Sequence, residues 1–132
     1  MQLSHIAIYA RDVRASVEFY ERAFGLRRSH FDDEENGAYA ELETGATTLA
    51  FVSNDLAERH LPEPYRRNDP AEPPPGVQLS LVVDDVEERF RRAVEAGGAR
   101  VAPPEPKPWG QVTAFVRDVD GVLVQLASKP GG

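Results

Sequence analysis

The sequence contains no cysteine, and only one tryptophan and one methionine, among its 132 residues. The lack of cysteine excludes disulfides, thiolate metal ligands and cysteine nucleophiles, although a secreted protein can also lack disulfides. No stretch approaches the ~18 apolar residues that a membrane-spanning helix requires, and the first residues lack the basic and apolar segments of a signal peptide. We therefore expect a cytoplasmic protein with no membrane partner.

Positive charge is also in short supply. The chain has 15 Lys and Arg against 22 Asp and Glu, a formal net charge of -7. Such a field repels nucleic acid and favours a cationic partner; the alternative is that the acidity serves only solubility. An acidic run at residues 32–35, ahead of Asn36-Gly37, predicts a hairpin tip that is either simply solvated or a negative rim for a cationic ligand.

The first part of the chain recurs 73 positions later (78 minus 5). Residues 5–13 (HIAIYARDV) lie over residues 78–86 (QLSLVVDDV). Both runs carry aliphatic residues at alternate positions, as expected of a strand with one face packed on a helix. Each run ends near an acid that can cap a helix, Asp12 or Asp85.

A helix is expected after each cap. Glu88 follows Asp85 by three residues, which is a variant of the capping box. Gly25 and Gly98 stand where the helices should end in the left-handed conformation. Apolar residues spaced by four, three and four positions form the buried stripes, and they are Val13, Val17, Tyr20 and Phe24, then Val86, Phe90, Ala93 and Gly97.

Three strand-like runs follow each helix, so the pattern is βαβββ twice. We expect an α+β single domain over residues 1–132, with modules at 1–53 and 77–128 and an extended connector at 54–76 that holds six prolines. The competing interpretation is an ordinary α+β domain whose two units are alike by accident. The expected strands cover residues 27–31, 38–43, 47–53, 99–102, 112–117 and 122–128.

Several short motifs add a family resemblance. They are His5 in the first strand, Asp12, Phe19-Tyr20, Gly25-Leu26 and the hairpin at 115–126, which is similar to the pattern F-x-x-D-P-D-G-N-x-x-E-L. Together they resemble the vicinal oxygen chelate superfamily of glyoxalases, bleomycin-resistance proteins and extradiol dioxygenases. The resemblance implies a cup-shaped, eight-stranded mixed sheet with the helices outside and the ligand inside. It also implies a homodimer, in which modules are exchanged between chains in some members.

Catalytic members of this superfamily hold one divalent metal in the cup. The resemblance places the four ligand positions at His5, Ala50, Gln78 and Gln125. Only His5 is a good ligand there, because alanine has no donor and glutamine brings no charge. We therefore expect no metal and no other cofactor.

Further residues are expected to line the cup. Tyr9 shares a strand face with His5 and should point inward, where its ring can stack on a ligand. Phe115 and Arg117 alternate along one strand and should face the same way. Trp109, on a turn near the expected mouth of the cup, either stacks on the ligand or covers a sheet edge or the dimer seam.

Two residues are candidates for proton transfer, His5 and Glu41. The competing interpretation of His5 is a histidine that bonds Gln78 or Gln125 in a polar network on the cup floor. Glu41 and Glu43 share one strand face, which is either the cup or a solvated surface.

The sequence leads to one preferred function and two rivals. The preferred function is metal-independent binding of a small aromatic or cationic molecule, as the resemblance to bleomycin-resistance proteins implies. The first rival is an enzyme of the glyoxalase, lyase or dioxygenase kind, with an irregular metal site or with His5 and Glu41 acting without metal. The second rival is a regulatory or scaffolding domain that binds no small ligand.

Overall fold

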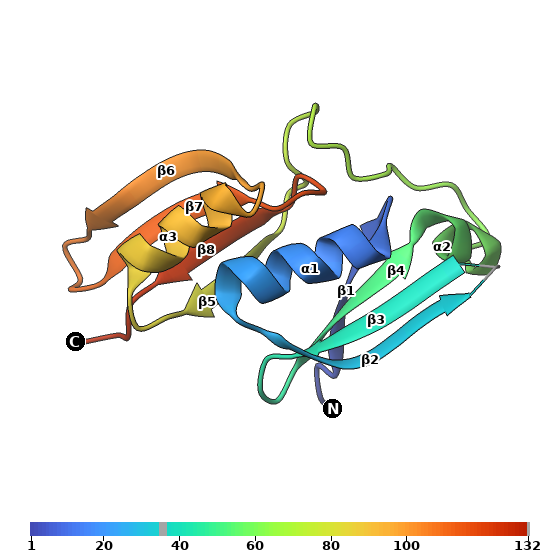
Figure 1. The fold of residues 1–132 in the computed structure, drawn as a ribbon, viewed down its shortest axis with the longest axis horizontal. Coiled ribbons are helices and arrows are strands. Elements are labelled where there is room, and N and C mark those ends of the chain that lie inside the picture. The colour runs from blue at the N-terminus through green and yellow to red at the C-terminus, as the bar shows by residue number, and fades with distance from the viewer. Residues whose placement is uncertain (35–36, 132) are drawn as a thin grey trace.

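A computed structural model describes residues 1–34 and 37–131, over which the chain forms eight strands and three helices. Two βαβββ units follow one another, and a short helix and a connector lie between them (Figure 1). In chain order the elements are β1 (His5–Ala10), α1 (Val13–Phe24), β2 (Arg27–Glu34), β3 (Gly37–Glu43), β4 (Thr48–Ser53), α2 (Asn54–His60), β5 (Gln78–Val82), α3 (Val86–Glu95), β6 (Ala99–Pro106), β7 (Val112–Arg117) and β8 (Leu123–Ala127).

The strands form two four-stranded sheets with the same topology. The first has the order β1-β4-β3-β2 and the second the order β5-β8-β7-β6. In each sheet the first strand pairs in parallel with the last, and the other neighbours are antiparallel. The expected α+β fold and mixed pairing are therefore confirmed, with the eight strands divided between two sheets instead of running through one.

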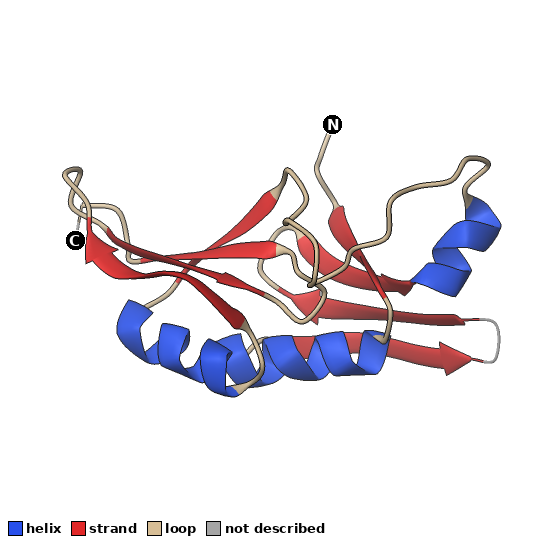
Figure 2. Ribbon diagram, turned by 90° about the horizontal axis from the view of Figure 1, so that it is seen from above, coloured by secondary structure: helices blue, strands red, loops and turns tan. Residues whose placement is uncertain are grey.

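Both main helices lie on the same side of the sheets (Figure 2). The opposite face of each sheet carries neither α1 nor α3, and we call these the first and second open faces. This layering is what the alternating strands predict, because only one face of each sheet is buried against a helix. Over the same described residues, no helix has the length and apolarity needed to cross a membrane.

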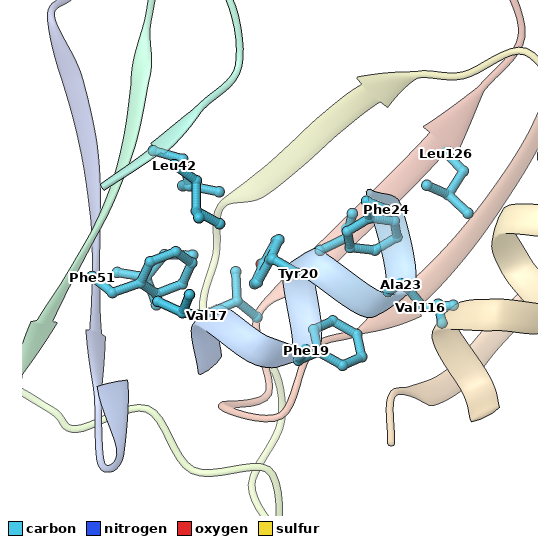
Figure 3. Packing of buried hydrophobic residues seen from close by; sticks show 14 of the residues in the cluster. Val17, Phe19, Tyr20, Ala23, Phe24, Leu42, Phe51, Val116 and Leu126 are labelled. Atoms are coloured by element: carbon cyan, nitrogen blue, oxygen red, sulfur yellow. The ribbon is translucent and has the colours of Figure 1, made fainter. Parts of the chain in front are cut away.

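Helix α1 begins and ends where its sequence predicts. The Asp12 side chain accepts a hydrogen bond from the Ala15 amide at 3.1 Å, and Gly25 adopts the left-handed conformation with φ 68°. The helix packs against β3 and β4 of the first sheet and against α3 of the second unit. Figure 3 shows Tyr20 turned toward Phe51 of the first sheet and Phe24 turned toward the second.

Helix α3 repeats the cap but not its expected end. The Asp85 side chain accepts from the Glu88 amide at 3.1 Å. The carboxylate of Glu88 does not close a capping box, since it accepts from the guanidinium of Arg92 at 2.8 Å. The left-handed end expected at Gly98 is wrong, because the positive φ of 114° belongs to Gly97.

Gly98 is a glycine for a different reason. A Cβ at this position would lie 2.9 Å from the carbonyl oxygen of Ala93 and 3.1 Å from the ring of Phe19. The second unit therefore meets α1 of the first unit so closely that no side chain fits there.

The connector expected at 54–76 is partly wrong. It begins with helix α2, whose first turn is capped by the Ser53 hydroxyl accepting from the Leu56 amide at 3.2 Å. This helix was not predicted because its seven residues are too few to show a helical apolar pattern in the sequence. Strands β2 and β6 run on to Glu34 and Pro106, beyond the expected ends at 31 and 102; β6 can hold prolines because it is an edge strand. The turn expected at Asn36 and the acidic residue Glu35 lie outside the described residues.

Candidate functional site

Two features determine which side chains project from the first open face: the alternation of side chains along β3 and the register in which β3 pairs with β4. Ala40 and Leu42 are fully buried on the helix side, so Tyr39 and Glu41 project from the open face. Pairing of β3 with β4 puts Glu41 opposite Ala50. The Glu41 side chain therefore projects next to the small side chain of Ala50.

Four side chains form one hydrogen-bonded group on this face, which we call the open-face cluster: Ser4, His5, Tyr39 and Glu41. The His5 ring contacts Glu41 Oε2 through Nε2 at 3.1 Å and the Ser4 hydroxyl through Nδ1 at 2.9 Å. The Tyr39 hydroxyl donates to the same Glu41 oxygen at 2.6 Å. The polar network expected between His5 and Gln78 or Gln125 is wrong, because the ring bonds Ser4 and Glu41.

The cluster keeps its carboxylate ionised. The hydroxyl of Tyr39, and after it the ring of His5, lower the pKa of Glu41 below its ordinary value. Partial burial and the bond to Glu41 raise the pKa of Tyr39 to about 12, so this hydroxyl stays a donor at neutral pH. The side chain of Glu41 is 27% exposed and that of His5 is 44% exposed, so both are accessible to a ligand.

The second open face carries a neutral chain of hydrogen bonds. Gln78 Nε2 donates to the Ser80 hydroxyl at 3.1 Å, and Ser80 donates to Gln125 Oε1 at 3.0 Å. Phe115 lies opposite Gln125 in the register of β7 and β8. Gln78, Phe115 and Gln125 thus lie on one face of the second sheet, and their role in ligand binding stays a prediction. Ser80 was not among the predicted site residues, although its alternation with Gln78 is the signal that could have found it.

The four metal-ligand positions do not make a donor set for a divalent ion. Ala50 is 1% exposed and has no donor atom. Gln78 and Gln125 are joined through Ser80, and neither brings a charge. Among residues 1–34 and 37–131, no three or more His, Asp or Glu side chains are grouped closely enough to hold an ion. The residues at these four positions therefore do not fit the divalent-metal site that the family resemblance implies.

Two predicted ligand-binding residues contact the connector. The guanidinium of Arg117 donates to the carbonyl oxygens of Glu72 at 2.7 Å and Gly121 at 2.8 Å. The ring of Tyr9 packs edge-on against Tyr65, with centroids 5.0 Å apart. Both side chains help to hold residues 61–77 in place, and a role in ligand binding stays a prediction for each.

Trp109 lies on the β6–β7 turn, which Figure 1 places at the outer end of the second sheet, near the C-terminus. Its side chain is 63% exposed, and its indole N–H donates to Gln111 Oε1 at 2.9 Å. The turn belongs to neither open-face hydrogen-bond network. Stacking of Trp109 on a ligand stays a prediction.

Two buried carboxylates were not among the predicted site residues, although both lie in the hairpin at 115–126 that carries part of the family resemblance. Asp118 and Asp120 are 2% and 5% exposed, in the turn between β7 and β8. Tyr20 of α1 donates to Asp118 Oδ2 at 2.6 Å, and the Ser16 hydroxyl donates to Asp120. Burial raises the pKa of both groups, that of Asp120 to about 6. We call these four residues the inter-unit junction, because they join the second unit to α1.

The chain is similar to proteins of several named kinds. Residues 2–126 match a family model described as the Glyoxalase/Bleomycin resistance protein/Dioxygenase superfamily. The chain is 27% identical to the uncharacterized protein YraH of Bacillus subtilis, over 96% of this chain and 97% of that one. It is 26% identical to a lactoylglutathione lyase of Neisseria meningitidis, over 100% of this chain and 94% of that one.

Solved structures share the fold. A glyoxalase-related enzyme from Fulvimarina pelagi superposes with a TM-score of 0.83 at 22% identity, over 97% of this chain and 88% of that one. TioX from Micromonospora sp. ML1 superposes with a TM-score of 0.70 at 24% identity, over 97% and 98% of the two chains. At these identities the likeness shows the fold alone.

Proposed function

Because the chain belongs to the glyoxalase/bleomycin resistance protein/dioxygenase superfamily, we propose that it binds a small aromatic or cationic molecule on its first open face, without a metal ion. One observation carries the proposal. Glu41 is an accessible carboxylate that two neighbours, Tyr39 and His5, hold in its ionised form. A fixed negative charge on an open surface attracts a cation.

The surroundings of Glu41 favour a cation that carries an aromatic ring. His30 lies opposite Glu41 in the register of β2 and β3, and its ring centroid is 6.1 Å from that of Tyr39. Two aromatic rings beside a carboxylate offer both a stacking surface and a counter-charge. The chain's net charge of -7 adds a long-range attraction for cations.

Metal independence rests on the donor set. An imidazole that already bonds Glu41, an alanine and two joined glutamines would hold a first-row divalent ion too weakly to survive dialysis. We therefore expect less than about 0.2 metal equivalents in the purified protein. Treatment with a chelator should leave ligand affinity unchanged, whereas stoichiometric metal lost in His5→Ala would contradict this part of the proposal.

A second function is favoured by the same contact. His5 Nε2 lies 3.1 Å from Glu41, so the carboxylate can orient an imidazole that takes a proton from a substrate. His5 would act as the base, Glu41 would orient its ring, and Tyr39 would position Glu41. Turnover that survives chelation and is lost in both His5→Ala and Glu41→Gln would support this metal-free acid–base chemistry.

We also propose that the chain forms a homodimer in the cytoplasm. Strands β1 and β5 each form one edge of their sheet, and exposed apolar side chains lie at or next to them, with Ile6 39%, Val77 65% and Val82 59% exposed. The lack of cysteine suits a reducing compartment. Light scattering at micromolar concentration should give twice 14.6 kDa, and a stable monomer would contradict the dimer.

The binding proposal is tested with a planar aromatic cation, 9-aminoacridine, titrated in a calorimeter. Glu41→Gln removes the charge and keeps the shape, and we expect about tenfold weaker binding. Glu43→Gln is the matched control, because it removes one charge two residues away on the same strand face, and its affinity should stay within about twofold. Equal losses in the two variants, or no preference for the cation over the neutral hydrocarbon anthracene, would contradict the proposal.

A further inference from the structure

The connector forms one wall of a cavity that is separate from the open-face cluster. The cavity has a volume of about 940 Å³ and lies between the connector and the β7–β8 turn. Small-ligand sites usually measure about 300 to 1,000 Å³. Its walls include Arg11, Arg66, Val119 and the prolines at 73–75, and none of the four residues of the open-face cluster.

The connector is held in place, although much of it is exposed. The Tyr65 hydroxyl donates to Asn54 Oδ1 at 2.6 Å, at the start of α2. The guanidinium of Arg117 donates to the carbonyl oxygens of Glu72 at 2.7 Å and Pro70 at 3.3 Å. Proline further restricts the backbone on this side. The wall of the cavity is therefore preformed, which lowers the entropic cost of binding a ligand.

Three guanidinium groups line this cavity in a chain that is acidic as a whole. Arg67 is ion-paired with Glu58, at 2.7 Å. The other two belong to Arg11, at the junction of β1 and α1, and to Arg66, in the connector. Across the part of the chain that the structure describes, the side chains of Arg11 and Arg66 make no hydrogen bond or ion pair. Two guanidinium groups therefore remain available to a ligand.

Two of the carboxylates at the cavity accept hydrogen bonds from other groups of the protein. Asp120 accepts from the Ser16 hydroxyl and from the backbone amide of Arg11. Asp69 Oδ1 accepts from the amide of Ala71 at 2.9 Å. The exposed carboxylates of Asp69 and Glu72 are the opposing charges that an anionic ligand would meet. Within the described ranges neither is bonded to Arg11 or Arg66, so both guanidinium groups can still turn toward a ligand.

We propose that this cavity binds an organic anion, whose phosphate or carboxylate lies between the guanidinium groups of Arg11 and Arg66. Arginine bonds such groups through paired N–H donors, which give both charge and direction. The apolar part of the anion packs against the prolines at 73–75. The chain then has two binding regions of opposite preference, one for a cation on the first open face and one for an anion beneath the connector.

Calorimetric titration with phenyl phosphate, benzoate and benzyl alcohol tests the proposal. We expect saturable binding of at least one anion and none of the neutral alcohol, and the stronger anion identifies the ligand group as phosphate or carboxylate. Arg11→Gln and Arg66→Gln should each weaken binding about tenfold, as expected for loss of a charge-assisted contact. Arg59→Gln, on α2 and outside the cavity, is the matched control and should bind like the wild type.

Two further measurements keep the result clear. Circular dichroism checks that each variant is folded, and Arg11→Lys, which keeps the charge, should retain more affinity than Arg11→Gln. Glu41→Gln should bind phenyl phosphate normally, so failure of cation binding on the open face leaves this test intact. No saturable binding of either anion, or an equal loss in Arg59→Gln, overturns the proposal.

Discussion

Two carboxylates of this chain accept a hydrogen bond from a tyrosine hydroxyl at the same distance, 2.6 Å, and their acidities move in opposite directions. On the open face, the bond from Tyr39 lowers the pKa of Glu41. At the inter-unit junction, burial raises the pKa of Asp118 although Tyr20 donates to it. Loss of hydration therefore outweighs the several hydrogen bonds that Asp118 accepts inside the protein, whereas the hydrogen bond from Tyr39 dominates for Glu41 at the surface.

The difference separates a group suited to binding from a group suited to holding the fold. Glu41 keeps its charge and its access to solvent, so the carboxylate can attract a ligand of opposite charge. Asp118 Oδ1 accepts from the amides of Asp120 and Val122, both at 2.9 Å, and its other oxygen accepts from Tyr20. It fixes the β7–β8 turn and joins that turn to α1.

Truncation of the two carboxylates should show the largest contrast. Asp118→Ala leaves a buried hydroxyl and two buried amides without their acceptor, and we expect a loss of about 3 to 5 kcal/mol in the free energy of unfolding. Glu41→Ala should cost less than about 1 kcal/mol, because its neighbours can bond water. Urea unfolding of both variants measures the difference. Similar losses would contradict the distinction between binding and structural carboxylates.

The pH dependence that Asp120 gives to the free energy of unfolding should be the next largest effect. Its pKa is raised from 3.8 to about 6 in the folded chain, so the stability it contributes is complete below pH 3.8 and is lost as the pH rises through 6. Between pH 4 and 7 the wild type should lose about 2 kcal/mol relative to Asp120→Asn. The asparagine can keep both contacts, since its oxygen accepts from the Arg11 amide and its amide group donates to Ser16. Parallel stability curves for the two proteins would show that the pKa is not raised.

Removal of each tyrosine hydroxyl gives a smaller contrast. Tyr20→Phe takes the donor from a buried carboxylate and should cost about 1 to 3 kcal/mol of unfolding free energy. Tyr39→Phe takes the donor from an exposed one and should cost less than about 1 kcal/mol. Thermal and urea unfolding compare the two. A larger loss in Tyr39→Phe would mean that the open-face cluster stabilises the fold.

The smallest effect concerns the acid limit of ligand binding. The hydroxyl of Tyr39 lowers the pKa of Glu41, so Tyr39→Phe should raise that pKa and move the acid loss of 9-aminoacridine binding to higher pH. Calorimetric titrations between pH 3 and 6, roughly the range in which a carboxyl titrates, measure the shift. An unchanged midpoint would show that Glu41 does not hold the ligand.

The features that depend on neighbouring residues could be predicted from the sequence. Asp12 and Asp85 cap helices because a side chain reaches an amide three residues on, and Gly25 ends its helix for an equally local reason. The buried stripes and the βαβββ repeat follow from spacing alone, except that Gly97, expected in the second stripe, lies beyond α3 and is exposed. After α3 the left-handed residue is Gly97, one position before the predicted Gly98, because either of two adjacent glycines can adopt that conformation.

The candidate site was less predictable, because its contacts join distant parts of the chain. His5 meets Glu41 only because β4 lies between β1 and β3, and 36 residues separate the two in sequence. Tyr20 and Asp118 are 98 residues apart, and nothing local marks either as a partner of the other.

The central claim is that the open-face cluster holds a cationic ligand, and nuclear magnetic resonance of the labelled protein tests it most directly. On titration with 9-aminoacridine, we expect the largest shift changes at Tyr39 and Glu41 and at the ring of His30, with the same saturation curve for all three. Changes confined to the connector cavity or to the turn that carries Trp109, or no saturable change at all, would contradict the claim.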